Sequence, residues 1–182
     1  DILFDNEDFL LVEKKKGTVV HPVTGNDKDT LANYVKGYLE STGQLDISLK
    51  RAGIVHRLDK GVSGLIVFAK SLESQQYLQK QFESHQVRKI YLADIEYKQL
   101  RRGIKKYFSE KELSVDEEVE KLEKSNFVFD STWLKAQGYI VRSKRNRVKM
   151  EFRKYVGRVG KKAVSYIKPI NDKQVLNVIE TG

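Results

Sequence analysis

Residues 53–70 read GIVHRLDKGVSGLIVFAK and form the most informative stretch of the chain. Apolar, strand-like runs stand near its two ends, at residues 54–56 and 65–68, with a polar turn between them. The turn contains Arg57 and Asp59, close to glycines that allow a tight backbone path. The stretch therefore predicts two short strands that hold a guanidinium and a carboxylate on rigid flanks.

Working outward, the apolar spacing predicts an α+β fold with a mixed, largely antiparallel central β-sheet flanked by helices. Asp29 is placed to cap a helix with an apolar stripe, and Ser71 to cap a second helix that runs to about Glu83. The stripe of the first helix contains Leu31, Tyr34, Val35, Tyr38 and Leu39, and that of the second contains Tyr77, Leu78 and Phe82. The expected strands beyond residues 53–70 are 9–12, 89–96, 148–153, 163–167 and 175–180.

Residues 98–137 have a different character and predict a helical insertion. Ser114 and Glu117 stand in the capping-box spacing, ahead of a charged helical run. With 182 residues, the chain has the length of one domain with a hydrophobic core. We expect residues 1–182 to form a single domain that carries this insertion.

The composition excludes several classes of protein. There is no cysteine, so neither disulfides nor thiolate metal sites can form. No apolar run approaches the ~20 residues of a membrane span, and the first residues lack the basic start of a signal peptide. We therefore expect a protein of a reducing compartment, cytoplasmic or organellar, with no membrane partner, and a monomer.

The net charge of +9 is concentrated in one segment, residues 142–162. This segment contains ten lysines and arginines and a single acid, Glu151, which gives it a net charge of +9. The remainder of the chain is therefore neutral overall. Such a segment attracts a polyanion such as RNA through its phosphates, and a solvated basic face is an equal alternative. An acidic lipid surface is less favoured, because no strong amphipathic helix coincides with the segment.

Asp59 is the main candidate for chemistry, because a carboxylate can act as a nucleophile or as a general base. In an extended backbone Arg57 faces the same side, where it can bind phosphate or stack on a base. A turn aspartate and a surface ion pair are the alternatives. His56 and Asp59 could hold a metal, but no third ligand lies nearby, so we expect none. His56 is then an orienting, phosphate-contacting or structural histidine.

Tyr91 is the second candidate, in the predicted strand that follows Arg88 and Lys89. The period of two places its ring opposite Ile90 and Leu92, on the face directed to solvent. Base stacking on such a ring is worth about 1–3 kcal/mol per base. A half-buried strand tyrosine is the alternative.

These motifs together resemble the RluA-type RNA pseudouridine synthases. The match is carried by His56-Arg57-Leu58-Asp59, then Ser63-Gly64, then Ala69-Lys70, and by Lys89-x-Tyr91-x-Ala93. Weaker matches lie in the right order at residues 2–22, 160–166 and 178–182. Val62 stands where the family usually has threonine, and Lys15-Lys16 where it has proline and a small residue. The family pattern continues past Gly182 with an arginine that pairs with the aspartate, so residues 1–182 resemble a catalytic domain without its C-terminal part.

The resemblance implies an RNA uridine isomerase that needs no cofactor and acts on rRNA or, as the next choice, tRNA. It assigns Asp59 as the nucleophile, Arg57 to the extrusion of the target base and Tyr91 to stacking on it. The residues expected to contact RNA are His56, Lys60, Arg88, Lys89, Arg145, Arg147, Lys161 and Lys162. A catalytically impaired RNA-binding protein derived from the family is the alternative function.

Overall fold

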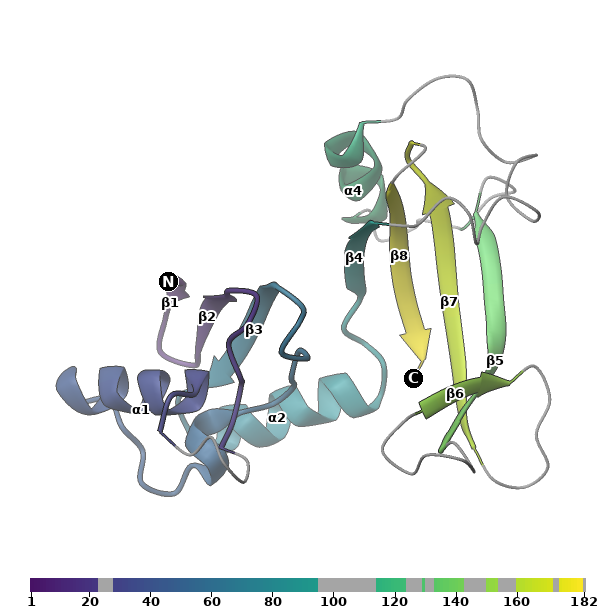
Figure 1. The fold of residues 1–182 in the computed structure, drawn as a ribbon. Coiled ribbons are helices and arrows are strands. Elements are labelled where there is room, and N and C mark those ends of the chain that lie inside the picture. Colours follow the sequence, from purple (N-terminus) through teal and green to yellow (C-terminus); the bar gives the residue numbers. More distant parts are fainter. Residues whose placement is uncertain are drawn as a thin grey trace. The chain divides into compact units, whose positions relative to one another are not determined.

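The structure, a computed structural model, describes residues 1–22, 28–94, 114–123, 129, 133–142, 150–153, 160–171 and 174–181. The chain divides into two compact units, Asp1–Val87 and Arg88–Gly182. Each unit has its own antiparallel sheet (Figure 1). The expected α+β class and the antiparallel pairing are confirmed, with the strands distributed over two sheets.

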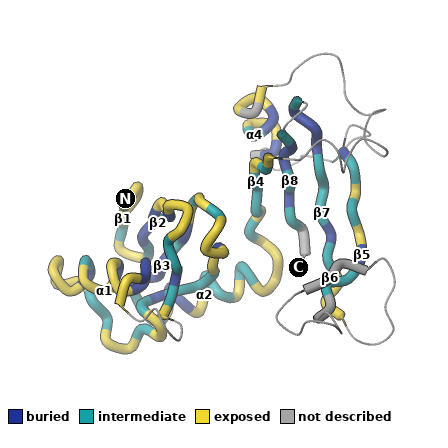
Figure 2. The backbone as a smooth tube through the Cα atoms, in the orientation of Figure 1, coloured by how far each residue is buried: buried dark blue, intermediate teal, exposed yellow. Residues whose placement is uncertain are grey.

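The N-terminal unit contains a three-stranded sheet and two helices. In spatial order the strands are β1 (Ile2–Asp5), β2 (Phe9–Lys14) and β3 (Gly64–Ala69). Side chains alternate along β2, so Leu10, Val12 and Lys14 are buried on one face. Ile66 and Phe68 of β3 are buried with them, and Figure 2 shows stretches of the buried colour within both strands.

Helices α1 (Leu31–Ser41) and α2 (Leu72–Glu83) begin at side-chain caps. Ser71 caps α2 as predicted, because its Oγ accepts a hydrogen bond from the Ser74 amide. The cap of α1 is Thr30 and not Asp29, since Thr30 Oγ1 accepts from the Asn33 amide.

The predicted apolar stripes are only partly buried. Leu31, Val35 and Leu39 lie in the core of the N-terminal unit, whereas Tyr34 is 54% exposed. On α2, Tyr77 is 63% exposed, and the buried position next to it belongs to Gln75.

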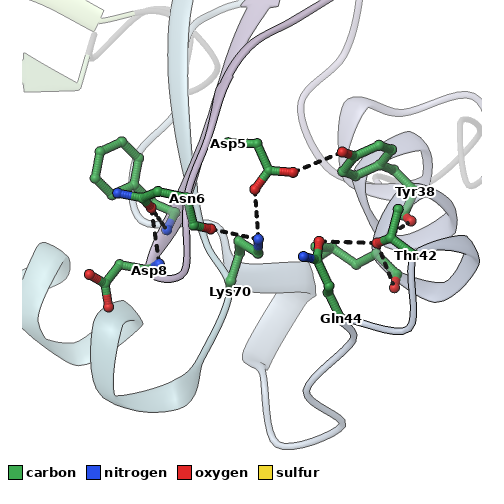
Figure 3. A network of polar contacts seen from close by, with 9 residues as sticks. Asp5, Asn6, Asp8, Tyr38, Thr42, Gln44 and Lys70 are labelled. Carbon is green, nitrogen blue, oxygen red and sulfur yellow. Dashed lines mark hydrogen bonds and ion pairs between the residues drawn. The ribbon is translucent and has the colours of Figure 1, made fainter.

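A polar network joins β1, α1 and the end of β3 (Figure 3). The buried Lys70 ammonium donates to Asp5 Oδ1 at 2.6 Å and to the Asn6 carbonyl at 2.6 Å. Tyr38 donates its hydroxyl to Asp5 Oδ2 at 2.8 Å. The bonds from Lys70 and Tyr38 lower the pKa of Asp5, which stabilises its ionised form.

The C-terminal unit contains a five-stranded antiparallel sheet and one described helix, α4 (Val115–Glu123). In spatial order its strands are β4 (Lys89–Asp94), β8 (Gln174–Thr181), β7 (Lys161–Pro169), β5 (Leu134–Arg142) and β6 (Met150–Arg153). Its hydrophobic core is formed by Leu122 of α4, Trp133 and the inward residues of β8, among others. Ile90 of β4 packs against this core, but Leu92 is 50% exposed, so its predicted burial is wrong.

The predicted insertion at residues 98–137 contains α4 and the first residues of β5. Ser114 Oγ accepts from the Glu117 amide at 3.4 Å, so the expected cap is present. Residues 134–137 pair with β7 inside the sheet. The extent of the insertion and the assignment of 1–182 to a single domain remain predictions.

Candidate active site

The Asp59 turn lies between a 3₁₀ turn, η1 (Lys50–Gly53), and strand β3. The strand expected at residues 54–56 is wrong, because only an isolated bridge from Ile54 to Phe68 forms there. Gly53 has φ 78°, and a Cβ at this position would meet the Ala69 carbonyl oxygen at 2.0 Å. Only glycine permits this close approach, which holds the start of the segment against the end of β3.

Lys14 supports the turn from inside the unit. Its ammonium is fully buried and donates to the carbonyls of Val62 at 2.5 Å and Lys60 at 3.3 Å. It also donates to its neighbour, Lys15, at 3.2 Å, so all three of its protons have acceptors. The Gly17 amide adds a bond of 2.7 Å to the Lys60 carbonyl. The turn is therefore fixed to the end of β2 and the residues just after it by three hydrogen bonds, two from Lys14 and one from Gly17.

Burial lowers the pKa of Lys14, and the negative charge of Asp59 opposes that shift. The ammonium thus places a positive charge near the carboxylate without forming a direct ion pair with it. Our sequence reasoning missed Lys14. The available signal was its inward position in the alternation of β2, after Leu10 and Val12.

Asp59 and Arg57 both project into solvent. Their side chains are 87% and 63% exposed, and Arg57 Nη2 lies 4.0 Å from Asp59 Oδ1. Leu58, between them, is buried, and the Val62 amide donates to the Asp59 carbonyl at 3.0 Å. The turn therefore presents a carboxylate and a guanidinium side by side to any ligand that approaches from solvent.

His56 connects the turn to β3 and α2. Its Nε2 accepts a hydrogen bond from the Val67 amide at 3.0 Å, so we assign the proton of the neutral ring to Nδ1. The ring stacks on Phe82, with centroids 4.4 Å apart and planes 19° apart. These contacts agree with two of the roles considered for His56, an orienting and a structural one. A contact between His56 and RNA remains a prediction.

The other predicted residues divide between the two units. Lys60 is exposed on the Asp59 turn. Tyr91 lies in β4, half-buried and opposite Asn177 of β8, with Arg88 and Lys89 just before it. Lys161 and Lys162 are exposed at the start of β7, whereas Arg145 and Arg147 lie outside the described residues.

The described part of the chain shows neither a metal-binding cluster nor a membrane-spanning helix. It contains no group of three or more histidine, cysteine, aspartate or glutamate side chains placed to hold a metal ion. Among the described helices, none has the length and apolar character needed to cross a membrane.

Comparison with known proteins places the chain in a family. Residues 8–182 match the family model described as RNA pseudouridylate synthase, and the chain therefore belongs to the RNA pseudouridylate synthase family. The expectation from the sequence motifs is thus confirmed at the level of the family.

Two relatives are the ribosomal large subunit pseudouridine synthases D of Nitrosomonas europaea and Neisseria meningitidis serogroup B. The first is 41% identical over 92 residues, which are 50% of this chain and 26% of that protein. The second is 42% identical over 93 residues, which are 51% of this chain and 24% of that protein. The match thus spans about a quarter of the length of these relatives.

Two solved structures share the fold over the whole chain. They are human RNA pseudouridylate synthase domain containing 4 and human RNA pseudouridylate synthase domain containing 1. Both have a TM-score of 0.58, at 16% and 18% sequence identity, and this chain covers 59% of each.

Proposed function

We propose that this chain forms the catalytic part of an RNA pseudouridine synthase in which Asp59 is the reactive group. The observation that carries the proposal is the Asp59 turn itself. Its carboxylate is 87% exposed, it has Arg57 at 4.0 Å, and the backbone beneath it is held by the buried Lys14. An open carboxylate on a fixed turn meets the requirement of a nucleophile that must reach an extruded nucleotide.

The reaction is an isomerisation, so no cofactor or second substrate is required. A target uridine leaves the RNA stack at a cost of a few kcal/mol, and Arg57 helps to extrude it or fills the gap. Asp59 attacks either the anomeric carbon of the ribose or carbon 6 of the base, and the glycosidic bond to N1 breaks. The uracil turns and rejoins the ribose through carbon 5, the bond to Asp59 breaks, and carbon 5 loses its proton while N1 gains one, so that no atom is gained or lost overall.

Tyr91 has two proposed roles in this sequence of steps. Its ring stacks on the uracil, and the residue takes part in the final removal of the proton. Support comes from its place in β4 two residues after Lys89 and three after Arg88, two cations suited to the flanking phosphates.

The substrate is proposed to be rRNA, with tRNA as the next choice. The relatives at about 40% identity are named as ribosomal large subunit enzymes, and the chain carries a net charge of +9. His56, Lys60, Lys161 and Lys162, together with Arg145 and Arg147, remain our candidates for contacts to this RNA. We propose that the protein acts as a monomer in the cytoplasm.

Asp59→Asn in the full-length protein tests the proposal, because it removes the charge and keeps the shape of the side chain. Each variant is expressed in cells that lack the gene, and pseudouridine is mapped along rRNA and tRNA. We expect the modification at the target site to fall by at least about 10³-fold, because the nucleophile is lost. Glu83→Gln, at an exposed carboxylate in the same unit, is the matched control and leaves modification unchanged.

Full modification by Asp59→Asn at every site would refute the assignment of Asp59. A wild-type protein that binds RNA but restores no pseudouridine would instead support a catalytically impaired RNA-binding protein.

A further inference from the structure

One hollow in the N-terminal unit lies apart from the Asp59 turn, which does not line it. Its volume is 400 Å³, and it is lined by residues of α1, of η1 and of the segment before α1. Pro22, Ala52 and Ile54 contribute an apolar part of its wall, and the basic side chains on it are His21, Lys36 and Arg51.

The charge of this cavity distinguishes it from two other hollows of the same unit. No acidic side chain lines it among the described residues. A larger hollow of 570 Å³ is lined by three carboxylates and two lysines, and one of 330 Å³ has two carboxylates and no lysine or arginine among its described lining. Lys36 also lies 3.7 Å from Glu40, but both side chains are more than half exposed, so this pair is weak. An anion is therefore favoured in the 400 Å³ cavity.

The wall that carries Arg51 has an unusual backbone. Arg51 has φ 52° and ψ 44°, and Ala52 has φ 53° and ψ 36°, so two non-glycine residues in succession are left-handed. Left-handed backbone is unfavourable for residues with a Cβ, and this strain persists only where the surroundings enforce it. Strained backbone of this kind concentrates at binding and catalytic sites.

The strained backbone is held in place by hydrogen bonds from a buried side chain of α2. Gln75 of α2 is 2% exposed, and its Oε1 accepts from the Lys50 amide at 3.1 Å. Its Nε2 donates to the Lys50 carbonyl at 2.7 Å and to the Ile54 carbonyl at 3.1 Å, so one side chain brackets the whole turn. The arginine is thus presented from a fixed backbone rather than from a mobile loop.

We propose that this cavity binds a phosphodiester group of the RNA strand, a few nucleotides from the target uridine. The guanidinium of Arg51 and the ammonium of Lys36 hold the phosphate oxygens, and the apolar wall receives the adjoining sugar. Ile54 lies five residues before Asp59, at most about 18 Å of extended chain, so one strand can reach both places. This inference rests on the proposed function, because it takes RNA as the substrate.

The test is the salt dependence of RNA binding by the full-length protein, measured by fluorescence anisotropy over a series of KCl concentrations. Arg51→Gln removes one phosphate contact, so the slope of log affinity against log salt falls by about 0.7. Affinity falls by about 5-fold at low salt, while kcat at saturating RNA is unchanged. Arg51→Lys keeps the charge and most of the slope.

Two further variants distinguish loss of the cavity's charge from disruption of the strained turn and from loss of any surface charge. Lys36→Gln, on the surface of α1, lowers the slope in the same way without touching the strained turn. Lys80 is an exposed residue of α2 that does not line the cavity, so Lys80→Gln should leave the salt slope and the RNA affinity unchanged. Thermal unfolding of each variant confirms that it is folded.

An unchanged slope in folded Arg51→Gln and Lys36→Gln proteins overturns the proposal. Inorganic phosphate, added at constant ionic strength, distinguishes an RNA contact from a site for a small free anion. If phosphate binds in a manner that depends on Arg51 while the RNA slope does not, the cavity serves a free anion and the proposal is wrong. A slope that depends on Arg51 in a protein that makes no pseudouridine would refute the proposed function and retain the phosphate site.

Discussion

Lys14 in the N-terminal unit and Lys168 in the C-terminal unit are both buried lysines, 0% and 8% exposed, but their ammonium groups have different hydrogen-bond partners. Lys168 donates to Glu118 Oε2 at 2.6 Å, so its charge is matched by a carboxylate that is itself buried. Lys14 donates only to main-chain carbonyls among its described hydrogen bonds.

The difference has a consequence for function. A carboxylate that forms a buried ion pair with a lysine is hydrogen-bonded to the ammonium and shielded from solvent, so it cannot contact a substrate. Around Lys14, dipoles of the Asp59 turn take the place of a carboxylate, and Asp59 itself stays in solvent. The same residue type thus stabilises packing in one unit and, in the other, supports the turn whose exposed carboxylate we propose to be reactive.

The largest expected effect is on the buried pair. Glu118→Gln leaves the Lys168 ammonium buried without a countercharge, which costs about 3–5 kcal/mol in the free energy of unfolding. Chemical denaturation at neutral pH measures this loss. Glu118→Gln combined with Lys168→Met removes both charges and should recover most of it. A loss below ~1 kcal/mol in the single variant would show that the pair is not buried as described.

The same pair has a pH signature. Burial alone raises the pKa of Glu118, but the bonds from Lys121 and Lys168 outweigh it and hold the pKa below 4.5. The folded state therefore binds fewer protons than the unfolded state in this range. The resulting stability is present above about pH 4.5 and is lost as the pH falls through the folded pKa. Glu118→Gln should lack this component of acid unfolding.

Lys14→Met comes next. It removes the bond to the Val62 carbonyl and one of the two bonds to the Lys60 carbonyl, which still accepts from the Gly17 amide, and this costs about 2–3 kcal/mol of stability. Because the backbone under Asp59 is released, we also expect kcat to fall by about 10²-fold at a temperature where the variant is folded. Lys15→Met, at an exposed neighbour, is the control and should change neither quantity much. Normal turnover by folded Lys14→Met would show that the turn needs no support from beneath.

The smallest effect is expected at Val62, where the family usually has threonine. Its main chain already bonds to Lys14 and to the Asp59 carbonyl, and its side chain is half-buried. Val62→Thr restores the hydroxyl without altering those bonds, so stability should change by less than about 0.5 kcal/mol. We expect pseudouridine formation to change by less than about 3-fold. A large gain would indicate that the hydroxyl contacts the substrate.

The first residues of the helices show where the local sequence is sufficient to predict the structure. The caps at Ser71 and Ser114 were predicted, because a side-chain oxygen and an amide three residues ahead are local in the chain. The cap of α1 was misplaced by one residue, since Asp29 and Thr30 are both good caps and only the backbone decides between them.

The exposure of Tyr77 shows where local sequence fails. The apolar stripe of α2 placed this residue inward, but the buried position belongs to Gln75. The helix buries an amide because the strained turn at residues 50–54 needs one donor and acceptor pair to bracket it. Nothing within one turn of α2 signals that need.

The family, the alternating strands and the polar turn that carries Arg57 and Asp59 could be predicted from the sequence, because each depends on residues adjacent or a few positions apart. The contacts that hold the turn in place appear only in the folded structure. Lys14 reaches Val62 across 48 positions, and Gln75 reaches Lys50 across 25. Hydrogen bonds over such separations exist only once the strands and helices have packed, so no local pattern records them.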